Sequence, residues 1–193
     1  MPDERDGHTR TMASPDNDPF DLDFSNYAPP PVTEAQQESL KEETEVGATK
    51  LGASGFFTTV NRVGRLRPQP GEKPVVLVVE DDDSTRMVLE QVVAKLGYVA
   101  RGAADKAGIL QGLKAAPRPS LVLLDVMLPD ADGFGVLNKI RQSPSLSGLP
   151  VVMLTSRSEK SDILKGLALG ADGYITKPAK LSVLKKVMAE LLG

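Results

Sequence analysis

Acidic side chains follow two apolar runs of the sequence at the point where each run ends. The run Val75–Val79 is followed by Glu80 and Asp81, and the run Leu121–Leu124 is followed by Asp125. Short continuous apolar runs are typical of buried strands in a parallel sheet, and open α/β sheets bind ligands beyond the carboxyl ends of such strands. If the two strands are neighbours, their carboxylates converge, and close carboxylates repel unless a cation neutralises them. We therefore predict a hard-metal site that contains a reactive aspartate, Asp125.

Two more polar residues follow later apolar runs. Thr155 ends the run Val151–Thr155, and Lys177 follows directly after Tyr174–Thr176. A hydroxyl donor and a point positive charge suit an anion such as phosphate. Carboxylate oxygens with retained waters are the ligands that Mg²⁺ prefers. Together these residue types indicate transfer of a phosphoryl group onto a carboxylate, with Asp125 as the nucleophile.

The elements that must position these residues alternate in a βα rhythm over residues 74–193. We expect strands at 75–79, 98–101, 121–124, 151–155 and 174–176, and helices at 84–96, 106–115, 134–141, 159–169 and 181–192. This alternation predicts an α/β fold, a doubly wound five-stranded parallel sheet with helices on both faces. On the first of these helices we expect Met87, Val88, Val92 and Leu96, or their neighbours, to face inward.

Composition excludes several classes of protein. The chain has no Cys and a single His, His8, so thiol chemistry, histidine metal cages and a Ser-His-Asp triad inside the domain are excluded. The net charge of −3 disfavours nucleic acid as a partner, and the three lysines of the last helix are expected to form a solvated face. Because the N-terminus lacks an apolar core and no apolar stretch reaches membrane-spanning length, we expect no membrane span and a cytoplasmic location.

Residues 1–73 differ from the rest in composition. They are acidic and rich in Asp, Pro, Ser and Thr, which predicts a largely disordered tail. A capping-box pattern at Thr33–Gln36 predicts a short helix from Glu34 to Val46. Aromatic residues interleaved with acids at 20–27, and apolar residues at helical spacing over 56–63, are candidate short linear motifs that order on a partner. The alternative is a linker in which these aromatic residues have no role.

Residues 74–193 resemble the response-regulator receiver domains of two-component signalling, the CheY-like family. Four motifs carry the resemblance in order along the domain: Glu80-Asp81-Asp82, Leu-Leu-Asp125-Val-Met127-Leu-Pro129-Asp-Ala-Asp132-Gly133, Leu154-Thr155-Ser156 and Tyr174-Ile-Thr-Lys177-Pro178. The resemblance implies a flavodoxin-like sheet with its five strands in the order 2-1-3-4-5. It also implies a phosphoprotein with autocatalytic phosphorylation and dephosphorylation, and no enzyme activity on a separate substrate.

The resemblance assigns a role to each site residue. Asp125 would accept the phosphoryl group from the phosphohistidine of a histidine kinase or phosphotransfer protein. Asp81, Asp125 and the backbone carbonyl of Met127 would hold Mg²⁺, with Glu80 acting through water. Lys177 would pair with the phosphoryl oxygens.

Three further positions are implied to belong to the switch or to its support. Thr155 and Tyr174 fall on the family's switch positions, where a hydroxyl moves toward the phosphoryl group and an aromatic ring turns inward. The peptide bond before Pro178 is expected to be cis. Output would pass through protein contacts on the face of the fourth helix, fifth strand and fifth helix of the domain, and through the tail.

Some positions depart from the family's commonest pattern, and two alternatives stay open. Ser156 replaces an alanine, and Ala131 replaces a larger apolar residue. Met127 and Arg157 flank the site, where a thioether and a cation would hinder an attacking water, so we predict slow dephosphorylation. We expect a response regulator without a C-terminal output domain; the alternatives are a non-switching pseudo-receiver that acts as a binding or localisation module, and a phosphate shuttle or sink.

Overall fold

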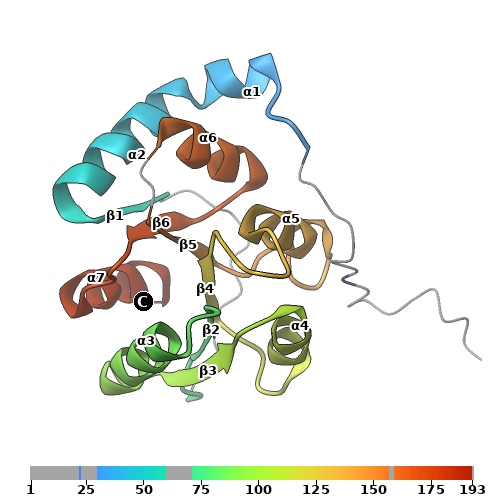
Figure 1. Cartoon of the computed structure of the whole chain (residues 1–193), viewed down its shortest axis with the longest axis vertical. Coiled ribbons are helices and arrows are strands. Elements are labelled where there is room, and N and C mark those ends of the chain that lie inside the picture. The colour runs from blue at the N-terminus through green and yellow to red at the C-terminus, as the bar shows by residue number, and fades with distance from the viewer. Residues whose placement is uncertain (1–21, 23–29, 60–70, 157–158, 193) are drawn as a thin grey trace, which may run out of the picture.

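A six-stranded sheet forms the centre of the molecule (Figure 1). The computed structural model describes residues 22, 30–59, 71–156 and 159–192. The strands follow the spatial order β1-β6-β5-β4-β2-β3, and all neighbours are parallel except β1 and β6. Their bounds are β1 Phe56–Thr58, β2 Val75–Val79, β3 Val99–Ala103, β4 Leu121–Asp125, β5 Val151–Thr155 and β6 Gly173–Thr176.

Helices cover both faces of this sheet (Figure 1). Their bounds are α1 Glu34–Ser39, α2 Lys41–Ser54, α3 Asp83–Lys95, α4 Lys106–Lys114, α5 Gly133–Gln142, α6 Lys160–Leu169 and α7 Leu181–Leu192. One apolar core lies between the sheet and α4, α5 and α6, and a second lies between the sheet and α3 and α7. The central strands β2, β4 and β5 are buried over their whole length, as expected for a parallel sheet covered on both faces.

The predicted doubly wound fold is confirmed. The five predicted strands correspond to β2, β3, β4, β5 and β6, and their order β3-β2-β4-β5-β6 is the expected 2-1-3-4-5. The prediction for the inward face of α3 is wrong for Met87 and Val88 themselves, whereas Val92 and Leu96 pack against the core. Met87 and Val88 are both 58% exposed, and the buried residues of this helix are Leu89 and Val93.

The structure differs from the expected disordered tail over residues 30–59. These residues form α1, α2 and β1, and Leu22 is also buried in the core that lies between the sheet and α4, α5 and α6. The predicted capping box is present, because Thr33 accepts from the backbone N–H of Gln36 and the Gln36 side chain accepts from the backbone N–H of Thr33. Phe56 and Phe57 lie in a strand, so the predicted helical face over 56–63 is wrong at its start.

The physical reason for this difference is burial against the distant part of the chain. Leu51 and Phe57 are almost fully buried, and both pack into the core that α6 and β6 help to form. The segment itself contains few apolar residues, so its local composition predicts disorder. Composition does not show that these residues are buried against a part of the chain that is distant in sequence. The candidate motif residues Phe20, Phe24, Tyr27, Val60 and Val63 lie outside the described residues.

Candidate functional site

The sheet brings the predicted site residues to one edge. Glu80 follows β2, Asp125 ends β4, Thr155 ends β5 and Lys177 follows β6. These four strands are consecutive in the sheet, so their carboxyl ends lie side by side. The parallel register supports this placement, since Asp125 pairs with Leu154 and Thr155 pairs with Thr176.

Lys177 joins the two buried carboxylates of the site. Its Nζ lies 2.6 Å from Asp125 Oδ2 and 2.7 Å from Glu80 Oε2. Burial raises the pKa of the Glu80 carboxyl, although the hydrogen bond from Lys177 works against this rise. Burial alone would lower the pKa of Lys177, but the hydrogen bonds to Asp125 and Glu80 outweigh it and hold this pKa above its usual value. Lys177 is therefore a fixed positive charge beside Asp125.

A third carboxylate completes an oxygen-rich cluster. Ligand oxygens of Glu80, Asp81 and Asp125 all lie within 4.8 Å of one another, with Asp81 on the exposed side. Carboxylate oxygens in a group of three suit a hard divalent cation, and a cation would offset the repulsion that Lys177 alone does not cancel. The donor set therefore fits a divalent metal ion.

Asp82 has a different role from its neighbour Asp81. Its Oδ1 accepts a hydrogen bond of 2.7 Å from the backbone N–H of Thr85, so it caps the N-terminus of α3. Hydrogen bonds from Thr85 lower the pKa of Asp82. Of the acidic residues after β2, Asp82 therefore caps α3, whereas Glu80 and Asp81 belong to the carboxylate cluster.

The loop after β4 holds the Asp125 carboxylate in place. The backbone N–H of Met127 donates to Asp125 Oδ1 at 3.1 Å, and the N–H of Gly133 donates to the carbonyl of Val126 at 3.0 Å. A Cβ on Gly133 would lie 2.2 Å from the carbonyl oxygen of Asp125, so only glycine permits this close return of the loop. The Gly of the Asp125-to-Gly133 motif is therefore a packing requirement of the site.

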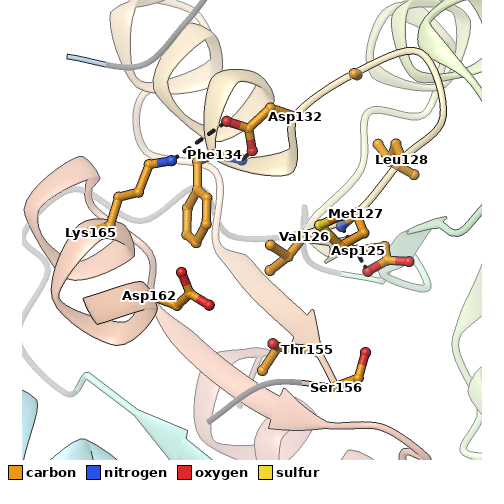
Figure 2. Close-up of a pocket in the computed structure, with 11 residues that line it drawn as sticks. Asp125, Val126, Met127, Leu128, Asp132, Phe134, Thr155, Ser156, Asp162 and Lys165 are labelled. Carbon is orange, nitrogen blue, oxygen red and sulfur yellow. Dashed lines mark hydrogen bonds and ion pairs between the residues drawn. The ribbon is translucent and has the colours of Figure 1, made fainter. Parts of the chain in front are cut away.

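A pocket of about 420 Å³ opens beside Asp125 (Figure 2). Figure 2 shows Lys165 of α6 reaching across the Phe134 ring toward Asp132. Its Nζ lies 4.4 Å from the ring centroid and 3.6 Å from Asp132 Oδ2. Residues from β4, β5, α5, α6 and the intervening loop line the pocket: Asp125, Val126, Met127, Leu128, Ala131, Asp132, Phe134, Thr155, Ser156, Asp162 and Lys165.

Lys165 is a site residue that the sequence patterns missed. A lysine in an amphipathic helix is ordinarily a solvated residue, so its position toward the pocket leaves no local signal. The side chain of Met127 is 63% exposed at the other side of this pocket, while Arg157 lies outside the described residues.

The two predicted switch residues are both buried in this structure. Thr155 lies at the end of β5 on the pocket wall, and Tyr174 is only 1% exposed. The Tyr174 hydroxyl lies 3.2 Å from the backbone carbonyl oxygens of both Asp162 and Ile163 on α6. Burial raises the pKa of Tyr174 well above its usual value of 10.0. The ring is thus turned inward against α6. The Lys177–Pro178 bond is cis, as expected.

Comparison with known proteins identifies the family. Residues 76–189 match the response regulator receiver domain family, and the chain belongs to this family of two-component signalling proteins. Among solved structures, the chemotaxis protein CheY4 of Vibrio cholerae is 28% identical with a TM-score of 0.59, covering 63% of this chain and all of that one. A CheY-like receiver domain protein of Methanospirillum hungatei is 27% identical with a TM-score of 0.56, covering 62% and 94%.

Curated relatives are longer than the matched region. The transcriptional regulatory protein AfsQ1 of Streptomyces coelicolor is 41% identical over 112 residues, which are 58% of this chain and 48% of that protein. The transcriptional regulatory protein GltR of Pseudomonas aeruginosa is 41% identical over 103 residues, which are 53% and 42% of the two chains. This chain therefore spans about half the length of the curated relatives that it matches. Within the described residues, no helix is both long and apolar enough to cross a membrane.

Proposed function

We propose that this receiver domain accepts a phosphoryl group on Asp125 from a phosphohistidine of a histidine kinase or phosphotransfer protein. A carboxylate oxygen of Asp125 forms a bond to phosphorus as the phosphorus–nitrogen bond of the phosphohistidine breaks. The electron pair of that bond stays on the imidazole nitrogen, which then takes a proton from solvent. The observation that carries the proposal is Lys177 Nζ at 2.6 Å from Asp125 Oδ2, a fixed cation where the transferred group would add negative charge.

Mg²⁺ is the cation that we assign to the carboxylate cluster. Asp81, Asp125 and the backbone carbonyl of Met127 would hold it, and Glu80 would act through a water molecule. When bound, the ion neutralises charge on the phosphoryl oxygens and orients the donor. The chain's own part is to hold ligand oxygens of the three carboxylates within 4.8 Å of one another and to keep Lys177 charged beside them.

The phosphoryl group would act by shifting the populations of two forms of the domain. Thr155 lies on the pocket wall beside Asp125, where its hydroxyl can donate to a phosphoryl oxygen. Tyr174 lies on β6, the strand that leads directly to Lys177. A group that binds both Thr155 and Lys177 therefore acts on β5 and β6 together, and downstream proteins would read the change by direct contact.

Intact-mass measurement after incubation with Mg²⁺ and acetyl phosphate tests this function. The 193-residue chain should gain the mass of one phosphoryl group, and Asp125→Asn should gain none. Asp130→Asn is the matched control, because it removes an exposed acid from the same loop and should leave the gain intact. If the wild type gains no mass, or if the gain persists in Asp125→Asn, the proposal is wrong, and a non-switching binding module becomes the better description.

A further inference from the structure

The Arg86 side chain connects the first turn of α3 with the loop that follows β2. Its Nη1 donates to the backbone carbonyl oxygen of Glu80 at 2.8 Å and to that of Asp81 at 3.3 Å. Its Nη2 pairs with Asp83 Oδ1 at the start of the helix. The side chain is only 19% exposed, so most of it lies against the protein. Three oxygens within residues 80–83 therefore bind one guanidinium group.

The two carbonyl groups that bind Arg86 lie beyond the end of the sheet pairing. Strand β2 pairs with β3 and β4 as far as Val79, and the N–H of Glu80 makes one further bond of 3.0 Å to the carbonyl oxygen of Ala103. Backbone carbonyl groups that have no strand partner need another donor. Arg86 supplies that donor, and it therefore holds the chain where the sheet no longer does.

These carbonyl groups belong to the two peptide groups on either side of the Asp81 Cα. A single nitrogen, Arg86 Nη1, binds both of them. Restraint of both peptide groups restrains the two backbone dihedral angles of Asp81, and these angles set the direction of its Cα–Cβ bond. Arg86 therefore orients the Asp81 side chain through the backbone.

Asp81 is the member of the carboxylate cluster that most needs such support. Glu80 and Asp125 are 2% and 4% exposed, and Lys177 binds both. Asp81 is exposed, yet its ligand oxygen lies within 4.8 Å of the other two. An exposed side chain gives up conformational freedom when it binds an ion, and a restrained backbone reduces that loss. The bonds from Arg86 thus act at the least anchored ligand of the site.

The neighbouring strand leaves room for the Arg86 side chain. In Figure 1, α3 lies against β2 and β3. A Cβ on Gly102 of β3 would lie 3.2 Å from Arg86 Cδ and 1.8 Å from Glu90 Oε1. The alkyl chain of Arg86 therefore passes a residue without a side chain, and packing as well as hydrogen bonding sets its course toward the loop.

We propose that Arg86 is a positioning residue of the cation site, which holds the backbone around Asp81 so that the three carboxylates face one another before the ion binds. This inference rests on the proposed function, in which Mg²⁺ occupies the cluster. Groups that orient metal ligands without touching the metal typically change its affinity by about 10–100-fold. Arg86 acts through Asp81 and not on the phosphoryl group.

The charge of Arg86 makes the sign of the expected effect informative. A guanidinium group near the cluster repels a divalent cation, so its removal would strengthen Mg²⁺ binding if charge alone mattered. Loss of positioning acts in the opposite direction, because Asp81 is then no longer held toward Glu80 and Asp125. Weaker Mg²⁺ binding after removal of this positive charge is therefore the opposite of the electrostatic expectation.

Three variants separate positioning from charge. Arg86→Met removes the guanidinium group and keeps an unbranched side chain beside Gly102. Arg86→Lys keeps the charge with a point donor in place of the planar fork, so it should retain part of the effect. Lys95→Met is the matched control, because it removes an exposed positive charge from the other end of the same helix.

Titration of the unmodified 193-residue protein with MgCl₂, followed by backbone amide signals in ¹H–¹⁵N NMR spectra, measures the affinity directly. Dispersed spectra show at the same time that each variant is folded. The Kd for Mg²⁺ should rise by about tenfold or more in Arg86→Met, by less in Arg86→Lys, and not at all in Lys95→Met. An equal or lower Kd in folded Arg86→Met would overturn the inference. If Arg86→Met does not fold, Arg86→Lys decides by the same criterion.

The Mg²⁺ dependence of phosphorylation by acetyl phosphate is an independent readout. In Arg86→Met the half-saturating Mg²⁺ concentration should rise by the same factor as the Kd, while the rate at saturating Mg²⁺ matches the wild type. A lower saturating rate with an unchanged Mg²⁺ requirement would contradict the positioning role. Wild-type protein that binds Mg²⁺ but gains no phosphoryl group would overturn the proposed function alone, whereas wild-type protein that binds no Mg²⁺ would overturn both.

Discussion

Tyr174 fills the space that Gly166 leaves open on α6. A Cβ on Gly166 would lie 1.6 Å from the Tyr174 hydroxyl oxygen, a separation that no rearrangement of a few tenths of an ångström relieves. The inward position of the Tyr174 ring therefore requires glycine at 166, and the same hydroxyl lies 3.2 Å from the carbonyl oxygens of Asp162 and Ile163.

Gly166→Ala should destabilise the fold by displacing the ring. The expected loss in free energy of unfolding is about 1–3 kcal/mol, the usual range for overpacking a well-filled core. Urea unfolding at neutral pH measures it. The double variant Gly166→Ala/Tyr174→Phe should lose less free energy of unfolding than the sum of the losses in the two single variants. The reason is that part of the clash in Gly166→Ala is with the Tyr174 hydroxyl, which the second substitution removes. A Gly166→Ala protein as stable as the wild type would show that the ring does not need this position.

Ionisation of Tyr174 should also lower the stability of the fold at alkaline pH. The pKa of Tyr174 is raised above 10.0 in the folded state, so the unfolded chain ionises at a lower pH than the folded one. The contribution of Tyr174 to stability is therefore complete below pH 10.0 and is lost as the pH rises above that value. Above this pH, the wild type should lose free energy of unfolding faster than Tyr174→Phe. The difference in tyrosinate absorbance between the two proteins should stay flat until the wild type unfolds. A rise near the ordinary tyrosine pKa in folded protein would contradict the inward position of Tyr174.

Removing the charge of Lys177 should affect both stability and chemistry. Lys177→Met leaves the buried carboxylates of Glu80 and Asp125 without their cation, which should cost about 3 kcal/mol in urea unfolding without added metal. The variant should also fail to gain mass with acetyl phosphate. Lys177→Arg keeps the charge and should recover most of the stability. Full phosphorylation of Lys177→Met would exclude the role proposed for this side chain.

Asp81 and Asp82, the neighbouring acids after β2, should have different roles in metal binding and in stability. Asp82→Ala removes the cap of α3 and should lower the free energy of unfolding, while Asp82→Asn keeps an acceptor and should lower it less. Both Asp82 variants should keep Mg²⁺-dependent phosphorylation. Asp81→Asn should instead lose this dependence with little change in stability. The reverse pattern would mean that Asp82 holds the metal and Asp81 does not.

Met127 should slow the loss of the phosphoryl group. Its exposed thioether side chain lies at the pocket beside Asp125, where we expect it to restrict the approach of an attacking water. Phosphorylated wild-type protein, freed of donor and followed by intact mass, should therefore lose its phosphoryl group more slowly than Met127→Ala. Wild-type protein that dephosphorylates within seconds, or a Met127→Ala protein with the same rate, would contradict this role.

The positions of Asp125 and Lys177 were predictable because short continuous apolar runs that alternate with helical segments identify the strands, and parallel strands end at one edge of a sheet. The inward face of α3 was not predictable, because its apolar residues extend too far around the helix to define one face. These residues are at positions 87, 88, 89, 92 and 93. Leu89 and Val93 are buried because the neighbouring sheet and α7 meet that side of the helix.

The packing of residues 30–59, which form α1, α2 and β1, could not be predicted from local sequence patterns for a different reason. Leu51 and Phe57 have little apolar sequence around them, and their partners Ile163 and Tyr174 lie far along the chain. The capping box at Thr33 was visible because a cap depends on residues only three positions apart. The start of this helix could thus be predicted from the sequence, whereas the surface against which a helix packs could not.

The antiparallel pairing of β1 has a practical consequence for work with fragments of this chain. Trimming the protein to the family-matched residues 76–189 would remove β1 and leave the N–H and carbonyl groups of β6 unpaired along one side. A bare sheet edge of this kind is a template for pairing with another molecule, and a short strand at the end of a sheet is one way in which proteins prevent such pairing. A minimal receiver fragment should therefore self-associate as its concentration rises, and a fragment that begins before α2 is the better choice for crystallisation.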